Sequence, residues 1–206
     1  MRRFALLALA LAALLPLQAG AADDALLARM ATVNPSLHSY SATLHAHVAL
    51  TTFPFLAADL AGKVYHKDPD LDKVEITSGL PAIAQGFSQL YPRMEPPSRW
   101  ESFFVVTKTG DDGKSTSFTL VPRKSGNVLR TLVTVDDATA TIRTVQWEYA
   151  NGGSAEMRLR YGEVQGNTLV VSQSGHVDEP NYKGDITATL SDYQVNPPLP
   201  DSLFTQ

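Results

Sequence analysis

The chain of 206 residues contains no cysteine. This absence excludes disulfide bonds, cysteine-ligated zinc and a lipidated cysteine that would tether the protein to a membrane. The chain also has no Asn-x-Ser/Thr acceptor for N-glycosylation, because Asn34 is followed by Pro35. Without covalent cross-links the protein depends on its hydrophobic core, and a chain of this length can bury one.

A hydrophobic run long enough to cross a membrane is also lacking. The apolar run at residues 4–15 spans twelve residues, against the roughly 20 that a bilayer needs. Arg2 and Arg3 precede it, and Pro16 and the small residues 19–21 follow it. This arrangement predicts a cleaved secretory signal peptide over residues 1–21. Because the residues after the arginine pair match twin-arginine signals poorly, we expect the general secretory route, leaving residues 22–206 as one soluble, unlipidated periplasmic domain.

Basic residues are the minority among the charged ones. The chain has 17 basic and 21 acidic residues, and the signal peptide holds two of the basic ones. The mature charge is therefore 15 − 21 = −6. With no basic run, the sequence argues against nucleic acid and against electrostatic docking to anionic lipid.

The clearest local pattern lies at residues 41–67, which predict a long β-hairpin. Apolar residues alternate with polar ones on both arms, as in strands with one buried face. Phe53, Phe55 and Leu56 stand at its tip, where a solvated turn normally carries polar residues. We expect this tip to contact a ligand or to close over it.

The rest of the chain predicts more strands around this hairpin. A short amphipathic helix is expected at residues 23–30, a third strand carries Val74 and Ile76, and short helices are expected within residues 77–99. Turn residues then separate seven predicted strands: 102–109, 115–122, 128–135, 141–149, 155–161, 168–174 and 183–195. The predicted fold is α+β and mainly antiparallel β: a large curved sheet or incomplete β-barrel with short helices covering one face.

Catalytic and metal-binding patterns are weak. His45 and His47 share one face of a strand at a metal-ligand spacing. A hairpin turning near residues 54–55 would place Tyr65 opposite His45 and Lys63 opposite His47, with no carboxylate nearby. No nucleophile motif surrounds residues 174–176. We therefore expect no enzyme, no metal and no cofactor, and a hydrolase or metalloprotein is the least favoured of three hypotheses.

Apolar surface is the remaining feature. About ten strands with few short helices leave a sheet face larger than its cover, and such a face closes on itself or holds an apolar ligand. The predicted hydrophobic ligand cavity combines this face with the hairpin tip and the following helices: Leu44, Val48, Leu50, Phe53, Phe55, Leu56, Leu60, Val64, Val74, Ile76, Leu80, Ile83, Phe87, Val145, Trp147, Met157 and Leu159.

The sequence resembles the LolA/LolB-like superfamily of bacterial lipoprotein carriers. The resemblance rests on residues 39–44, 62–65 and 68–75, and on the closing segment 193–204 with Asn before an acidic residue and Leu-Phe. It implies an unclosed barrel with a helical lid, and a monomeric periplasmic carrier that shields the acyl chains of lipoproteins or lipids. An inner-membrane donor complex and an outer-membrane acceptor are the implied partners.

The sequence departs from that family in several respects, two of which lie within the predicted domain. Residues 41–50 lack the arginine that latches the carrier's lid, and residues 80–100 form an insert where the carrier has a short turn. The alternative function is an envelope sensor or interaction module on the same fold, binding a protein partner.

Overall fold

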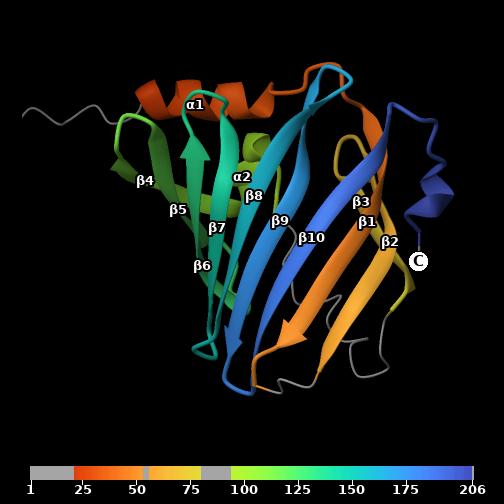
Figure 1. The fold of residues 1–206 in the computed structure, drawn as a ribbon. Helices are drawn as coiled ribbons and strands as arrows, with labels where there is room; N and C mark the ends of the chain where they lie inside the picture. The colour runs from red at the N-terminus through yellow and green to blue at the C-terminus, as the bar shows by residue number, and fades with distance from the viewer. Residues whose placement is uncertain (1–20, 53–55, 80–93, 206) are drawn as a thin grey trace, which may run out of the picture.

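The computed structural model describes residues 21–52, 56–79 and 94–205, with the side chains of residues 21–24 left out. Ten antiparallel strands form one sheet (Figure 1). The helical elements are α1 (Ala21–Ala31), α2 (Trp100–Phe103) and the 3₁₀ turns η3 (Pro97–Arg99) and η4 (Asp201–Leu203). The strands are β1 (Ser39–Leu50), β2 (Ala57–Lys67), β3 (Leu71–Ser78), β4 (Phe104–Asp111), β5 (Ser115–Pro122), β6 (Val128–Asp136), β7 (Thr141–Tyr149), β8 (Ser154–Val164), β9 (Asn167–Glu179) and β10 (Tyr182–Val195).

The sheet is open between two strands that are neighbours in the chain. Its order is β3-β2-β1-β10-β9-β8-β7-β6-β5-β4, so β3 and β4 form the two edges. Every pairing joins consecutive strands except that of β1 with β10. The predicted fold class, a curved and mainly antiparallel sheet with short helices, is confirmed.

The β1–β10 pairing is fixed at one end by Asn196. Its Oδ1 accepts hydrogen bonds from the backbone N–H of His38 at 2.8 Å and of Ser39 at 3.2 Å, and its Nδ2 donates to the Ser36 carbonyl at 2.9 Å. Asn196 has a φ of 54°, a conformation that asparagine tolerates better than most residues. This residue therefore joins the closing strand to the start of β1.

The main core fills one half of the curved sheet. Its five largest fully buried side chains are Trp100, Phe118, Leu120, Val133 and Val135. Trp100 packs edge-on against Phe118 with ring centroids 6.1 Å apart. In Figure 1, α1 lies across one end of this half, and its buried Leu26 and Met30 belong to the same core. The α1 helix predicted at residues 23–30 is thus confirmed, and it covers only part of the sheet.

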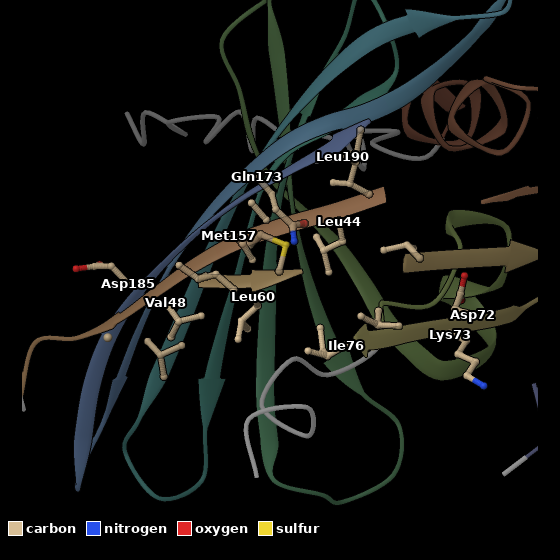
Figure 2. Close-up of a pocket in the computed structure, with 18 of the residues that line it drawn as sticks. Leu44, Val48, Leu60, Asp72, Lys73, Ile76, Met157, Gln173, Asp185 and Leu190 are labelled. Carbon is tan, nitrogen blue, oxygen red and sulfur yellow. The ribbon is translucent and has the colours of Figure 1, made fainter. Parts of the chain in front are cut away.

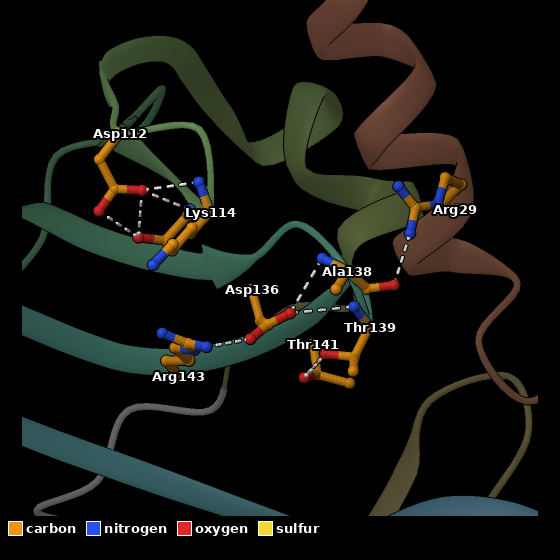
Figure 3. Close-up of polar contacts among 9 residues, drawn as sticks. Arg29, Asp112, Lys114, Asp136, Ala138, Thr139, Thr141 and Arg143 are labelled. Atoms are coloured by element: carbon orange, nitrogen blue, oxygen red, sulfur yellow. Dashed lines mark hydrogen bonds and ion pairs between the residues drawn. The ribbon is translucent and has the colours of Figure 1, made fainter.

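The turn between β6 and β7 anchors α1 (Figure 3). Asp136 Oδ1 accepts the backbone N–H groups of Ala138 at 2.9 Å and Thr139 at 3.0 Å, and its Oδ2 pairs with Arg143. The hydrogen bond from Thr139 is the main reason why the pKa of Asp136 lies below its usual value. Arg29 of α1 then donates to the Ala138 carbonyl at 2.9 Å.

Several element boundaries differ from the predictions. The strand expected from residue 102 starts at Phe104, because α2 occupies the preceding residues. The strand expected to end at residue 174 continues to Glu179. The signal peptide lies outside the described residues apart from Ala21, and so do residues 80–93, where helices were predicted.

None of the helices in the described residues is both long and apolar enough to cross a membrane.

Candidate functional site

An apolar cavity of about 620 Å³ lies against the half of the sheet formed by β1, β2, β3, β9 and β10 (Figure 2). This volume falls within the range of roughly 300–1,000 Å³ that is usual for ligand pockets. The lining residues are mostly aliphatic: Tyr40, Leu44, Ala46, Val48, Leu50, Leu60, Val64, Asp72, Lys73, Val74, Ile76, Met157, Val170, Gln173, Val177, Tyr182, Gly184, Asp185, Ile186, Ala188, Leu190 and Tyr193.

Strand alternation builds the wall of the cavity. On β1 and β10, Leu44 lies opposite Leu190 and Ala46 opposite Ala188, so these apolar side chains share one face. Between β2 and β3, Val64 lies opposite Val74. The wall is thus a continuous apolar surface of paired strands, with small residues at its centre.

The cavity exists because the two halves of the sheet are covered differently. Trp100 and α1 pack onto the half that holds the main core. Over the other half, the smaller cluster of Leu44, Ala46 and Ala188 is joined only by half-buried aliphatic neighbours from the same strands. Within residues 21–52, 56–79 and 94–205, no helix packs onto this second cluster.

Eight of the predicted cavity residues line the cavity: Leu44, Val48, Leu50, Leu60, Val64, Val74, Ile76 and Met157. Whether they bind a ligand stays a prediction. Leu56 and Leu159 are half-buried and do not line it. Phe53, Phe55, Leu80, Ile83 and Phe87 lie outside the described residues.

Val145 and Trp147 were predicted in the cavity, and the structure corrects this placement. They are 2% and 4% exposed and belong to the main core on β7. Alternation had identified their face of the sheet correctly. On this part of the face, Val145 and Trp147 pack in the same core as Trp100. Strand alternation does not reveal which part of a face is packed in this way.

Sequence reasoning missed much of the wall contributed by β9 and β10. On β10, alternation from residue 186 to residue 190 was a usable signal, and it places Ile186, Ala188 and Leu190 in the cavity. On β9, Val177 was missed because the predicted strand ended at residue 174, five residues before the end of β9.

One end of the cavity is polar. This polar end consists of the lining residues Tyr40, Asp72 and Tyr193, together with His66, which contacts Tyr40 and Asp72. The ring of Tyr40 stacks on His66 with centroids 5.2 Å apart, and lies 5.7 Å from the ring of Tyr193. His66 Nδ1 is 2.7 Å from Asp72 Oδ1. The polar end thus joins β1, β2, β3 and β10 at one mouth of the cavity.

Burial and the Asp72 charge shape the titration of this end. The hydrogen bond to Asp72 is the main cause that raises the pKa of His66, with Asp68 adding to it at 3.5 Å from Nε2. Burial raises the pKa of the Tyr40 hydroxyl, and the neighbouring Tyr193 and Asp72 raise it further. Burial also raises the pKa of Tyr193 to about 12. Burial therefore keeps both tyrosine hydroxyls neutral, and the Asp72 charge adds to this effect at Tyr40.

The predicted pairing around His45 and His47 was wrong by four residues. His45 lies opposite Ala61 and His47 opposite Asp59. A register shift by an even number of residues keeps every side chain on its predicted face. The assignment of side chains to the cavity wall is therefore unaffected. The expectation that no carboxylate lies nearby was also wrong, because His47 Nδ1 is 2.7 Å from Asp59 Oδ1.

Metal ligation finds no support in the part of the chain that the structure describes, where no group of three or more His, Asp or Glu side chains is placed to hold an ion. The other histidine considered as catalytic, His176, pairs across the sheet with Asp185 at 2.7 Å.

No protein-family model matches the chain, and no curated protein matches it. Solved structures do. A DUF1329 family protein from Desulfovibrio piger is similar at 16% identity with a TM-score of 0.63, over 89% of this chain and 96% of that one. A LolA superfamily protein from Nitrosomonas europaea is similar at 13% identity with a TM-score of 0.62, over 89% and 97%. A domain described as an outer membrane lipoprotein-sorting protein, from Vibrio parahaemolyticus, is similar at 12% identity with a TM-score of 0.59, over 87% and 94%. At these identities the likeness establishes the fold: this chain has the open-sheet fold of LolA superfamily proteins.

Proposed function

We propose that this protein is a periplasmic carrier that shields the acyl chains of lipoproteins or lipids in its apolar cavity. The observation that carries the proposal is the cavity of about 620 Å³ on the half of the sheet that no described helix covers. Its wall consists mainly of aliphatic side chains, which gain free energy when an acyl chain removes them from water, at roughly 25 cal/mol per Å².

Several apolar side chains of the cavity wall are partly exposed to water, which an acyl chain would displace. Val74 is 59% exposed although it lines the cavity. Leu60, Val64 and Ile76 are half-buried around the Leu44 cluster. Apolar side chains left partly in water mark ligand grooves and interaction sites.

The proposal also includes export of the protein to the periplasm and transfer of its cargo between two membrane partners. The charged, apolar and small-residue segments at residues 1–21 support secretion into the periplasm. The LolA-type fold supports lipoprotein handling, since one protein of similar structure is described as sorting outer membrane lipoproteins. The protein would then collect its cargo from an inner-membrane donor and deliver it to an outer-membrane acceptor, as a monomer without a cofactor.

The test measures cargo and transfer separately. The exported protein is purified without detergent, extracted with organic solvent, and both fractions are examined by mass spectrometry. It is then mixed with vesicles that hold a diacylated peptide, and the peptide is measured in the supernatant after the vesicles are sedimented. A carrier yields acyl lipid in the extract and raises the soluble peptide in proportion to protein. An empty extract with no soluble peptide contradicts the proposal.

A further inference from the structure

We propose that the polar end of the cavity, formed by Tyr40, His66, Asp72 and Tyr193, binds the cationic head of an amphiphile, and so selects ammonium-headed over carboxylate-headed ligands. This inference rests on the proposed acyl-binding function. The inference specifies the chemical class of the ligand's head group, which the apolar wall alone does not determine.

The first argument is the charge of the lining. Three charged residues line the cavity in the part of the chain that the structure describes: Asp72, Lys73 and Asp185, a net charge of −1. Lys73 is directed away, because its ammonium donates to the Leu203 carbonyl at 2.9 Å. Figure 2 shows the side chains of Asp72 and Lys73 pointing in opposite directions, and Asp185 at the far end from both. Asp185 is paired with His176 and alternates with the wall residue Ile186, so its carboxylate lies on the opposite face of the sheet. An anionic head at the polar end would therefore lie beside the Asp72 carboxylate, which is hydrogen-bonded to His66.

The second argument is the aromatic pair. The rings of Tyr40 and Tyr193 lie 5.7 Å apart and are inclined at 57°. Both line the cavity beside Asp72. The π face of an aromatic ring attracts a cation within about 6 Å of its centroid. Aromatic rings next to a carboxylate thus suit an ammonium group, which needs no specific hydrogen-bond geometry when it is fully methylated.

The third argument is hydrogen bonding. The Tyr193 hydroxyl is already used, since it donates to the Val170 carbonyl. Among the described residues the Tyr40 hydroxyl makes no hydrogen bond, although the ring stacks on His66 and contacts the tilted ring of Tyr193. It is thus available to the head of a ligand.

The structure also provides a matched control. His47 and Asp59 form the same histidine–carboxylate contact, 2.7 Å from Nδ1 to Oδ1, as His66 and Asp72 do. The His47 pair stands on the opposite face of the hairpin, because His47 alternates with the cavity residues Ala46 and Val48. Asp72→Asn on β3 and Asp59→Asn on β2 therefore remove the same charge from opposite faces of one sheet.

The experiment uses three probes with the same sixteen-carbon chain: hexadecyltrimethylammonium, hexadecanol and hexadecanoate. Each displaces a fluorescent acyl reporter from the mature protein below its micelle concentration. In the wild type we expect the ammonium probe to bind roughly tenfold more tightly than the carboxylate, with the alcohol between them, from partly exposed charge contacts and the aromatic faces. Asp72→Asn should narrow this ratio to about threefold, while Asp59→Asn should leave it unchanged.

A second variant separates the aromatic contribution. Tyr40→Leu keeps every charge, removes one ring, and should lower affinity for the ammonium probe several-fold more than for the alcohol.

Three results would overturn the proposal. They are equal or tighter binding of hexadecanoate by the wild type, an equal effect of the two asparagine variants, and an equal loss of both probes in Tyr40→Leu. Failure of the acyl-binding function looks different: hexadecanol would not bind at all, and both proposals would fall together.

Discussion

Filling the cavity should weaken acyl binding strongly at little cost in stability. Ala188 is 3% exposed, lies opposite Ala46 on the wall and points into the cavity. In Ala188→Phe the new ring gains roughly 1.5–3 kcal/mol by burial and loses roughly 1–3 kcal/mol by strain. The free energy of unfolding should therefore fall by no more than about 1.5 kcal/mol, which lowers the thermal midpoint by less than about 6 °C for a chain of this size.

Binding should respond much more strongly. If the ring displaces three methylene groups of the ligand, the loss is about 2.4 kcal/mol, or roughly fifty-fold in affinity. Affinity is measured with hexadecanol as the competing ligand, so that head-group charge plays no part. Thr189→Phe places the same ring on the exposed outer face of β10 and should bind like the wild type.

Leu120→Ala is the opposite control. Leu120 is fully buried in the main core, and its truncation should cost about 2–5 kcal/mol without changing affinity. If Ala188→Phe lowers the midpoint as much as Leu120→Ala does, the space beside Ala188 is already filled in the folded protein. If Ala188→Phe binds hexadecanol as tightly as the wild type does, the ligand binds elsewhere. Either result refutes the reasoning.

Three further predictions concern stability. The folded pKa of His66 is raised above its unfolded value of 6.5, so its contribution is fully present below pH 6.5 and is lost as the pH rises through the folded pKa; the wild-type thermal midpoint should fall over that window relative to His66→Asn, and parallel curves would contradict this. Asp136→Ala should lower the free energy of unfolding in urea by about 1–3 kcal/mol, because it leaves the Ala138 and Thr139 donors unpaired. As a control, Asp59→Ala, at a side chain that is 90% exposed, should change that free energy by less than about 0.5 kcal/mol. Tyr149→Phe should leave the free energy of unfolding unchanged or raise it, because the Tyr149 hydroxyl is buried without a hydrogen-bond partner in the described structure; a loss above about 1 kcal/mol would show that the hydroxyl is satisfied.

Strand alternation made the cavity wall predictable. Leu44, Leu60 and Val64 were assigned to one face from local sequence alone, and they line the cavity. The register of their hairpin was wrong by four residues, yet the assignment held because side-chain direction repeats every two residues. Local periodicity therefore predicts which face a side chain occupies before the strand partners are known.

The division of that face into core and cavity could not be predicted. Val145 and Trp147 satisfy the same alternation as the cavity residues, and the structure packs them with Trp100 and α1. Which strands receive that cover depends on the pairing of β1 with β10, which joins residues about 150 positions apart. No pattern within a single strand carries this information.

The sequence does carry a cause for the open half, in the size of its side chains. Around the main core the inward positions hold Trp100, Phe118 and Trp147, which fill the space between sheet and helices. Along the cavity wall Ala46 and Ala188 hold the central positions, and Gly184 lies opposite Leu50 at the end of β1. Gly184 has little room to change, because an added Cβ would stand 3.0 Å from the Ala49 carbonyl oxygen. Interiors normally pack to crystal-like density, so alanine and glycine on a wall that no described helix covers leave volume that their own strands cannot fill. The small residues on β1 and β10 therefore leave the volume of the cavity. For this reason a single large side chain at position 188 is the sharpest test of whether that volume binds the ligand.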